Sequence, residues 1–160
     1  MISFDLTGKV AVVTGASSGL GQQFARALSE QGCDVAILAR RKERLEEFSK
    51  ELKQNGHDCL PVSCDVTDEE SIKNAVKAVV DHFGKIAILV NAIAPGVYDT
   101  EMTHDALDAP GSLVLKNRVA LKRFGREGEM NGALIYFASD ACTYTTGQLL
   151  VIDGGMTSML

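Results

Sequence analysis

The stretch KVAVVTGASSGLG, Lys9 to Gly21, decides the fold class of this 160-residue chain. Its first half is a short run rich in valine, which indicates a buried strand. Its second half, TGASSGLG from Thr14 to Gly21, is a glycine-rich turn, and residues with helical spacing follow it. A turn of this kind between a strand and a helix predicts a pyrophosphate site, because the helix start offers free N–H groups and a positive dipole end.

Each small residue of the turn has an expected role. Gly15 permits the tight turn, whereas Gly19 and Gly21 let the backbone approach a ligand and let the helix pack on the strand. The two serines can add hydroxyl donors. The predicted binding residues of the turn are Gly15, Ser17, Ser18, Gly19, Leu20 and Gly21. A glycine string alone is weak support, but the strand–turn–helix context makes it specific.

Strands and helices alternate on the C-terminal side of this turn. We predict strands at Lys9–Val13, Asp34–Leu38, Asp58–Ser63, Ile86–Asn91 and Gln148–Ile152. We predict helices at Leu20–Gly32, Lys42–Gly56, Thr67–Gly84 and Arg126–Asp140. The alternation predicts one α/β domain over residues 1–160, a Rossmann-type doubly wound parallel sheet. The segment between Asn91 and Arg126 is loop-like and holds Pro95, Gly96, Pro110 and Gly111.

The third predicted helix carries two local signals. Thr67 and Glu70 have the spacing of a capping box. Its apolar stripe, which we expect to be buried, consists of Ile72, Val76, Val79 and Phe83. In the predicted helix at Arg126–Asp140, Met130 and Phe137 are spaced as core residues.

Composition and charge exclude several classes of function. Hydrophobic residues make up 46% and charged residues 23%, which is an ordinary globular balance. The net charge of -5, with both signs mixed along the chain, argues against a nucleic-acid or anionic-membrane surface. No apolar run has the length of a membrane span, and the N-terminus does not resemble a signal peptide.

The cysteines and the loop acids do not predict a metal site. None of the four cysteines lies in a C-x-x-C pattern, so we expect buried, reduced thiols in a cytoplasmic protein. Asp99, Glu101, His104 and Asp105 could together ligate a metal ion, but acids in loops are usually solvated, and we predict none.

Four segments, in order along the chain, carry a resemblance to the short-chain dehydrogenase/reductase family. TGASSGLG resembles the family's T-G-x-x-x-G-x-G fingerprint, and CDV at Cys64–Val66 resembles its adenine-contacting D-V pair. APGVYDTEM resembles the segment that borders the nicotinamide, and YTTGQLLVIDGG resembles the C-terminal strand with its turn. The resemblance implies a nicotinamide dinucleotide as cofactor and a homo-oligomer. It adds these residues to the site: Asp65, Val66, Asn91, Pro95, Gly96, Val97 and Thr100.

The choice of cofactor depends on the residues after the second predicted strand. In LARRKER, Ala39 stands where a carboxylate would favour NAD, and Arg40 and Arg41 follow it. An arginine can bind a 2′-phosphate through charge-assisted hydrogen bonds, so we expect NADP, with Arg40 as the phosphate contact. The alternatives are NAD, and arginines that merely begin a solvated helix.

The stretch ILVNAIAPG, from Ile88 to Gly96, reads as two family segments joined where a central block is missing. In the family that block carries a catalytic Ser and a Tyr-x-x-x-Lys pair. The three tyrosines of this chain, Tyr98, Tyr136 and Tyr144, are not followed four residues later by Lys. We therefore predict no catalytic residues, because without such a Lys the phenol is not prepared to transfer a proton.

Without that block, one face of the sheet should lose its cover. Right-handed crossovers place the third helix on the face opposite the first two and predict a strand order of 3-2-1-4-5. We expect another subunit, or the Thr103–Phe124 segment folded back, to bury the apolar face beside the third helix. Three hypotheses remain open: an inactive NADP-binding protein, a reductase with a substitute acid such as Tyr98, and an interaction partner of a full-length relative.

Overall fold

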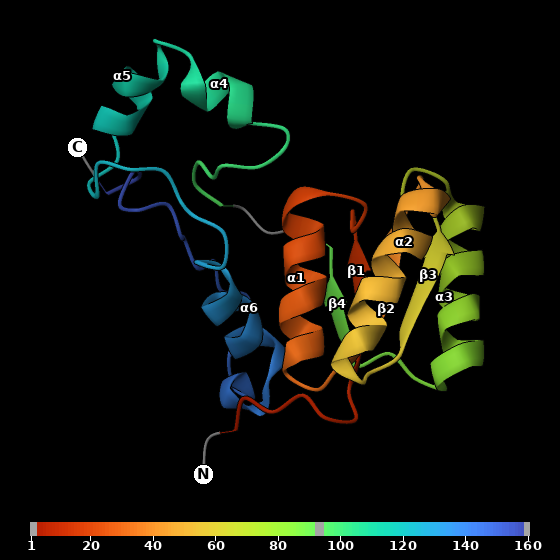
Figure 1. Ribbon diagram of the computed structural model, residues 1–160. Coiled ribbons are helices and arrows are strands. Elements are labelled where there is room, and N and C mark those ends of the chain that lie inside the picture. The colour runs from red at the N-terminus through yellow and green to blue at the C-terminus, as the bar shows by residue number, and fades with distance from the viewer. Residues whose placement is uncertain (1–2, 92–94, 159–160) are drawn as a thin grey trace.

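The computed structural model describes residues 3–91 and 95–158 of the chain, and it shows an α/β fold built on a parallel sheet (Figure 1). The strands are β1 (Val10–Thr14), β2 (Asp34–Ala39), β3 (Cys59–Ser63) and β4 (Ile88–Val90). The helices are α1 (Gly19–Glu30), α2 (Lys42–Leu52), α3 (Glu69–Phe83), α4 (His104–Asp108), α5 (Ser112–Asn117) and α6 (Asn131–Ala138), with short 3-10 turns at Lys53–Asn55 and Asp140–Cys142.

The sheet order is β3-β2-β1-β4, and every neighbouring pair is parallel. This confirms the predicted order for the first four strands. Val12 of β1 lies opposite Ala36 on one side and Leu89 on the other, so these three side chains share one face of the sheet. Parallel strands place all their carboxyl ends at one edge, where a ligand site is expected.

Two hydrophobic cores cover the two faces of the sheet. Ala11 and Val13 of β1 pack with α1, α2 and α6, whereas Val10 and Val12 pack with α3. The alternation follows from the strand period of two, and it confirms that α3 lies opposite α1 and α2. Cys33 and Cys59 lie within the first core, where burial raises the pKa of each thiol, to about 12 and about 11.

The predicted buried stripe of α3 is only partly right. Val79 is fully buried, but Ile72 and Val76 are exposed, and Ala75 is buried instead. The helix packs on β1, β2 and β3 through the line of residues that contains Ala75 and Val79. Nothing in the described residues covers the neighbouring line, which contains Ile72 and Val76. Its N-cap is Asp68 rather than Thr67.

The cap of α3 follows from the local hydrogen bonds. The side chain of Asp68 accepts a hydrogen bond from the N–H of Glu70 at 3.0 Å. The hydroxyl of Thr67 instead donates to Asp65 at 2.8 Å. The predicted capping box is therefore replaced by an Asp cap, which satisfies the same unpaired N–H groups.

The predicted fifth strand at Gln148–Ile152 is wrong. These residues form no strand, and Ile152 makes only an isolated parallel bridge to Pro95. Strand β4 is also shorter than predicted and ends at Val90. The bridge ties Ile152 to the segment after β4 rather than to β4 itself. The side chain of Leu149 is therefore 78% exposed and packs against few other residues.

Helix α6 is shorter than the predicted Arg126–Asp140. Gly128 has a left-handed φ of 85°, and Glu129 accepts a hydrogen bond from the N–H of Arg126, so the residues before Met130 form a turn. Met130 is buried as predicted, but Phe137 is 43% exposed.

The Thr103–Phe124 segment does not cover the face of the sheet on which α3 packs. It contains α4 and α5, which pack on each other, and Figure 1 shows both standing off beyond the start of α1, away from α3. Leu89 of β4, whose side chain lies on the same face of the sheet as α3, is consequently 65% exposed. The expectation that this segment folds back over that face is therefore wrong.

No helix of the described ranges, residues 3–91 and 95–158, is long and apolar enough to cross a membrane.

Candidate functional site

The turn between β1 and α1 requires glycine for its backbone angles at Gly15 and at Gly19, where φ is 57°, and for space at Gly21. Gly15, directly after β1, has a left-handed φ of 67°, which residues with a Cβ adopt at a cost. Gly21 has ordinary backbone angles, but a Cβ there would overlap the carbonyl oxygen of Gly15. The first turn of α1 therefore packs directly on the end of β1, as the sequence predicts.

The start of α1 lies at the carboxyl edge of the sheet without a side-chain cap. Ser18 is the N-cap residue with an extended backbone, and its hydroxyl does not bond the first N–H groups of the helix. A helix start of this kind carries unpaired N–H groups and a positive dipole end. Both favour a phosphate group, so the local structure fits the predicted pyrophosphate site.

Arg41 contacts this turn directly. Its Nη2 donates to the hydroxyl oxygens of Ser17 at 3.0 Å and Ser18 at 3.2 Å. The sequence pattern predicts Arg40 as the phosphate contact, with Arg41 only as its neighbour. Arg41 is the N-cap of α2, a position that turns its side chain back towards the start of α1. The pair of consecutive arginines was the only sequence signal for this contact.

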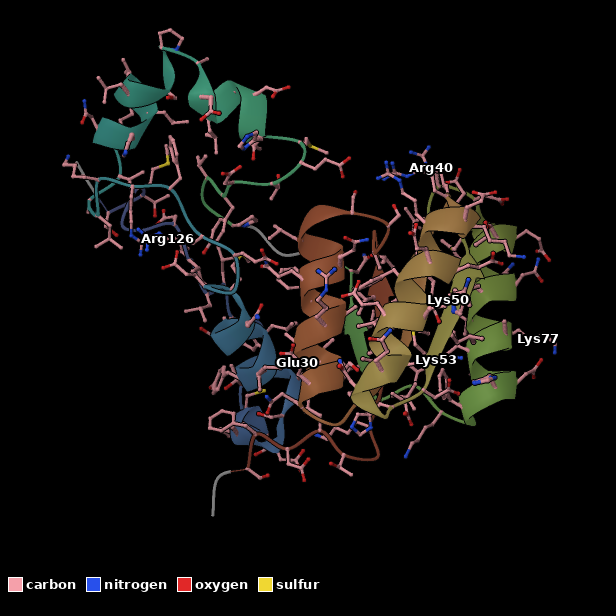
Figure 2. All side chains as sticks on the ribbon, viewed as in Figure 1. Glu30, Arg40, Lys50, Lys53, Lys77 and Arg126 are labelled. Atoms are coloured by element: carbon pink, nitrogen blue, oxygen red, sulfur yellow. The ribbon has the colours of Figure 1, made fainter. Side chains whose placement is uncertain are left out.

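Arg40 and Asp65 lie at the same edge of the sheet. Figure 2 shows the Arg40 side chain at the end of the molecule where α1 begins, pointing into solvent. Asp65 follows β3 and accepts hydrogen bonds from the N–H of Thr67 at 3.0 Å and from its hydroxyl at 2.8 Å. Those bonds, with a smaller effect of Arg40, lower the pKa of Asp65. Val66, the next residue, is 55% exposed.

The residues after β4 reach the site at two points. The Thr14 hydroxyl donates to Asn91 Oδ1 at 3.0 Å, which fixes the Asn91 side chain at the end of β1. Thr100 lies beside the start of α1, where a Cβ built on Gly19 would be 3.9 Å from the Thr100 Cβ. The Thr103 hydroxyl in turn accepts from the Thr100 N–H at 3.0 Å.

The segment between these points is tied to the C-terminal part of the chain. Gly96 N–H donates to the Ile152 carbonyl at 3.1 Å, and a Cβ on Gly96 would lie 2.5 Å from the Asp153 Cα. The carbonyl of Val97 accepts from the N–H of Gly125 at 2.9 Å. Pro95, Gly96 and Val97 are therefore held by these contacts and not by the turn, whereas Asn91 and Thr100 adjoin it.

A polar cavity of about 470 Å³ opens beside the start of α1. It is lined by Gly19, Gln22, Gln23, Arg26, Asp99, Thr100, Glu101, His104, Asp105 and Glu127. A hydrogen bond between His104 Nδ1 and Asp99 Oδ1, at 3.0 Å, raises the pKa of His104. Within the described ranges, no three His, Cys, Asp or Glu side chains are placed to hold a metal ion.

The tyrosines occupy three different surroundings. Tyr98 is only 7% exposed and packs against Gly125, where a Cβ would lie 2.5 Å from the ring. Burial, and then the charge of Glu129, raise the pKa of Tyr98. The Tyr136 hydroxyl lies 2.9 Å from the Thr145 hydroxyl, and Tyr144 is fully exposed. A raised pKa is the opposite of what an activated phenol requires.

Two family profiles match the chain, and together they cover almost all of it. The profile described as "short chain dehydrogenase" matches residues 9–106. The profile described as "Enoyl-(Acyl carrier protein) reductase" matches residues 87–157.

Curated relatives match over part of their length. The uncharacterized oxidoreductase YxnA of Bacillus subtilis is 34% identical over 141 residues, which is 84% of this chain and 39% of that protein. Dehydrogenase/reductase SDR family member 7 of Mus musculus is 44% identical over 92 residues, 55% of this chain and 27% of that protein. The chain thus spans about a quarter to two fifths of the length of these relatives.

Solved structures share the fold. An NADPH-dependent 3-quinuclidinone reductase from Rhodotorula rubra has a TM-score of 0.86 at 25% identity, with 96% of this chain and 92% of that chain covered. L-sorbose reductase from Gluconobacter frateurii, solved with NADPH and L-sorbose, has a TM-score of 0.88 at 21% identity, with 98% and 99% covered.

Proposed function

Because the chain belongs to the short-chain dehydrogenase family, we propose that it binds NADP through the adenosine–pyrophosphate half and by itself transfers no hydride. The observation that carries the proposal is the uncapped start of α1 beneath the Gly15–Gly21 turn. That turn brings unpaired N–H groups to the carboxyl edge of the sheet, at the position where such folds bind a pyrophosphate.

Two arginines support NADP over NAD. Arg40 follows β2 directly, and Arg41 Nη2 already lies at hydrogen-bonding distance from two hydroxyl groups of the turn. A 2′-phosphate placed there would accept charge-assisted hydrogen bonds from both guanidinium groups. Asp65, at the end of β3, and the exposed Val66 would border the adenine. The remaining proposed contacts are Ser17, Ser18, Gly19, Leu20, Asn91 and Thr100; Pro95, Gly96 and Val97 would border the nicotinamide side.

The proposal that this chain does not turn over substrate depends on its tyrosines. No Tyr is followed four residues later by Lys, and the buried Tyr98 has a raised pKa. Loss of a general acid or base alone typically costs about 10²–10⁴-fold in rate. The hypothesis that Tyr98 substitutes as the acid is therefore disfavoured by its surroundings.

The overlap of the two family profiles supports a junction between two family segments. They share residues 87–106, a range that contains β4 and the join at Val90–Asn91. In this proposal the chain combines the N-terminal dinucleotide half of the family with its C-terminal segment.

We further infer that the chain forms a homo-oligomer and resides in the cytoplasm. The exposed apolar side chains beside β4 support self-association, because large apolar patches are uncommon on monomers. Free thiols at Cys33 and Cys59, both buried in the core, suit a reducing compartment.

Thermal melting and a turnover assay test the function. NADPH at a hundredfold its dissociation constant should stabilise the fold by about 2.7 kcal/mol, which raises Tm by roughly 5–10 °C. NADH should raise it less. Absorbance of NADPH should stay constant with a panel of ketones, keto-sugars and acyl ketones. No shift with either nucleotide at millimolar concentration would refute binding, and robust turnover lost in Tyr98→Phe would refute inactivity.

A further inference from the structure

An exposed apolar line runs along α3 beside its buried line. Ile72, Val76 and Val80 are 39%, 43% and 42% exposed, and they follow one another at four-residue spacing on one side of the helix. Leu89, the exposed residue of β4, lies on the same face of the sheet, because its partner Val12 packs with α3. These four residues form what we term the α3 face.

We propose that the α3 face binds a second copy of this chain, with the two α3 helices antiparallel about a two-fold axis at Val76. This rests on the self-association inferred above and identifies the surface that carries it. The line is symmetric about Val76, since an aliphatic β-branched residue lies four positions before it and four after it. An antiparallel pair therefore packs Val76 on Val76 of the second copy, and Ile72 on its Val80.

The charges beside the line favour this partner and this direction. Glu69 lies at the start of α3 and Lys85 shortly beyond its end, so the antiparallel pair brings these opposite charges to the same end of the contact. Lys73 likewise approaches Asp81 of the second copy. A parallel pair would instead place each charged residue beside the same residue, with the same charge, of the second copy. Antiparallel helix dipoles also attract.

Lys77 is the one charged residue of α3 that would approach the same residue, Lys77, of the second copy near the axis. Within the chain it already forms an ion pair with Asp81 at 2.5 Å, and Lys73 pairs with Glu69 at 2.7 Å. The rim beside the apolar line is thus neutralised locally, which lowers the cost of bringing two such rims together. Stable interfaces bury about 800 Å² on each partner, so the proposed contact would include Leu89, on the same face of the sheet, as well as α3.

Disulfide trapping tests the axis. A Cys142→Ser background removes the half-buried thiol and leaves Cys33, Cys59 and Cys64, which are buried. In that background, Val76→Cys should form a disulfide-linked dimer on mild oxidation. Asn74→Cys is the matched control: it is exposed on the opposite side of α3 and should stay monomeric under the same conditions.

Sedimentation equilibrium at micromolar to tens of micromolar concentration tests the same surface without a crosslink. Val76→Glu should raise the dimer dissociation constant at least about tenfold, whereas Asn74→Glu should leave it unchanged. Circular dichroism and the NADPH melting shift check that each variant is folded.

The outcomes separate the claims. The protein could form a dimer that Val76→Cys does not trap and that Val76→Glu does not weaken. That result would overturn the α3 face as the interface, although self-association would stand. A wild-type monomer throughout the range would overturn both. Neither result would change the NADPH melting shift, which tests the nucleotide site alone.

Discussion

At the scale of single residues, Gly21 makes the most restrictive contact of the site. Its missing side chain lets α1 start against the carbonyl of Gly15, and this contact sets the direction of the helix start. A methyl group cannot be accommodated by a side-chain rotation, because the atom it meets belongs to the backbone. The position therefore links the stability of the fold to the shape of the proposed phosphate site.

We predict that Gly21→Ala destabilises the chain by roughly 1–3 kcal/mol through overpacking and removes NADPH binding. Gly132→Ala is the control, since Gly132 lies in α6 and a methyl group added there would meet nothing within 4 Å. Alanine there should stabilise by up to roughly 1 kcal/mol. Urea unfolding of both variants measures the difference. Equal stabilities would show that the close approach at Gly21 is not a constraint.

Arg41 leads to a prediction about selectivity. Arg41→Ala should weaken NADPH binding roughly 10- to 100-fold, because charged hydrogen bonds contribute about 1.5–3 kcal/mol each, and should affect NADH much less. Arg40→Ala should act in the same direction. Arg44→Ala, on the same helix but facing Glu101 at 3.5 Å, should change neither affinity. Equal losses for NADPH and NADH would mean that Arg41 only orders the turn.

The sequence predicted the glycines of the turn but not the role of Arg41. The glycines are fixed by local backbone geometry, which a short motif records. The Arg41 contact depends on how α2 begins relative to α1, two elements that are separated along the chain by β2. Nothing local to Arg41 records that relation.

At the scale of elements, the turn before α6 depends on one ion pair. Both oxygens of Glu129 accept hydrogen bonds from the Arg123 guanidinium, at 2.6 and 2.8 Å. These bonds, and a further one from the N–H of Arg126, lower the pKa of Glu129 from 4.5 to about 2. A lowered pKa means that the pair stabilises the fold above pH 4.5 and that its contribution disappears as the pH falls towards 2.

The predicted consequence is a pH-dependent difference between wild type and Glu129→Gln. Urea unfolding should show the same gap in free energy at pH 7 and pH 5, a narrower gap at pH 3, and none near pH 2. Glu127→Gln is the control, because Glu127 forms no ion pair in the described part of the chain. A gap that stayed constant down to pH 2 would contradict the assigned pair.

The elements that were predicted correctly have strong local patterns, and those that were not depend on partners. Strands β1, β2 and β3 have neighbours on the sheet and covering helices on both faces, so their apolar runs identify them. The run at Gln148–Ile152 has the composition of a strand, yet Ile152 bridges Pro95 and leaves β4 without a second neighbour in the described residues. Composition records the tendency to form a strand but not whether the chain brings that segment beside the free edge of β4.

At the scale of the whole molecule, the structure combines a well-packed N-terminal half with loosely covered C-terminal elements. The two cores around β1 and β2 are buried, whereas Leu89 and Leu149 are largely exposed. The sequence predicted little cover on this part of the sheet, because a parallel sheet is apolar on both faces and the junction proposed at Val90–Asn91 leaves out covering helices. It did not predict where Thr103–Phe124 would lie, since that segment has little apolar periodicity.

We propose that the adenosine half of an NADP site persists in this chain without the catalytic half. Calorimetric titration with adenosine 2′,5′-bisphosphate tests it most directly, because this ligand carries the adenosine and the 2′-phosphate but no nicotinamide. We predict that it binds within about tenfold of NADPH, since little of the affinity should come from the nicotinamide side, and that adenosine 5′-monophosphate binds more weakly. Binding of NADPH with no binding of the bisphosphate would contradict the claim.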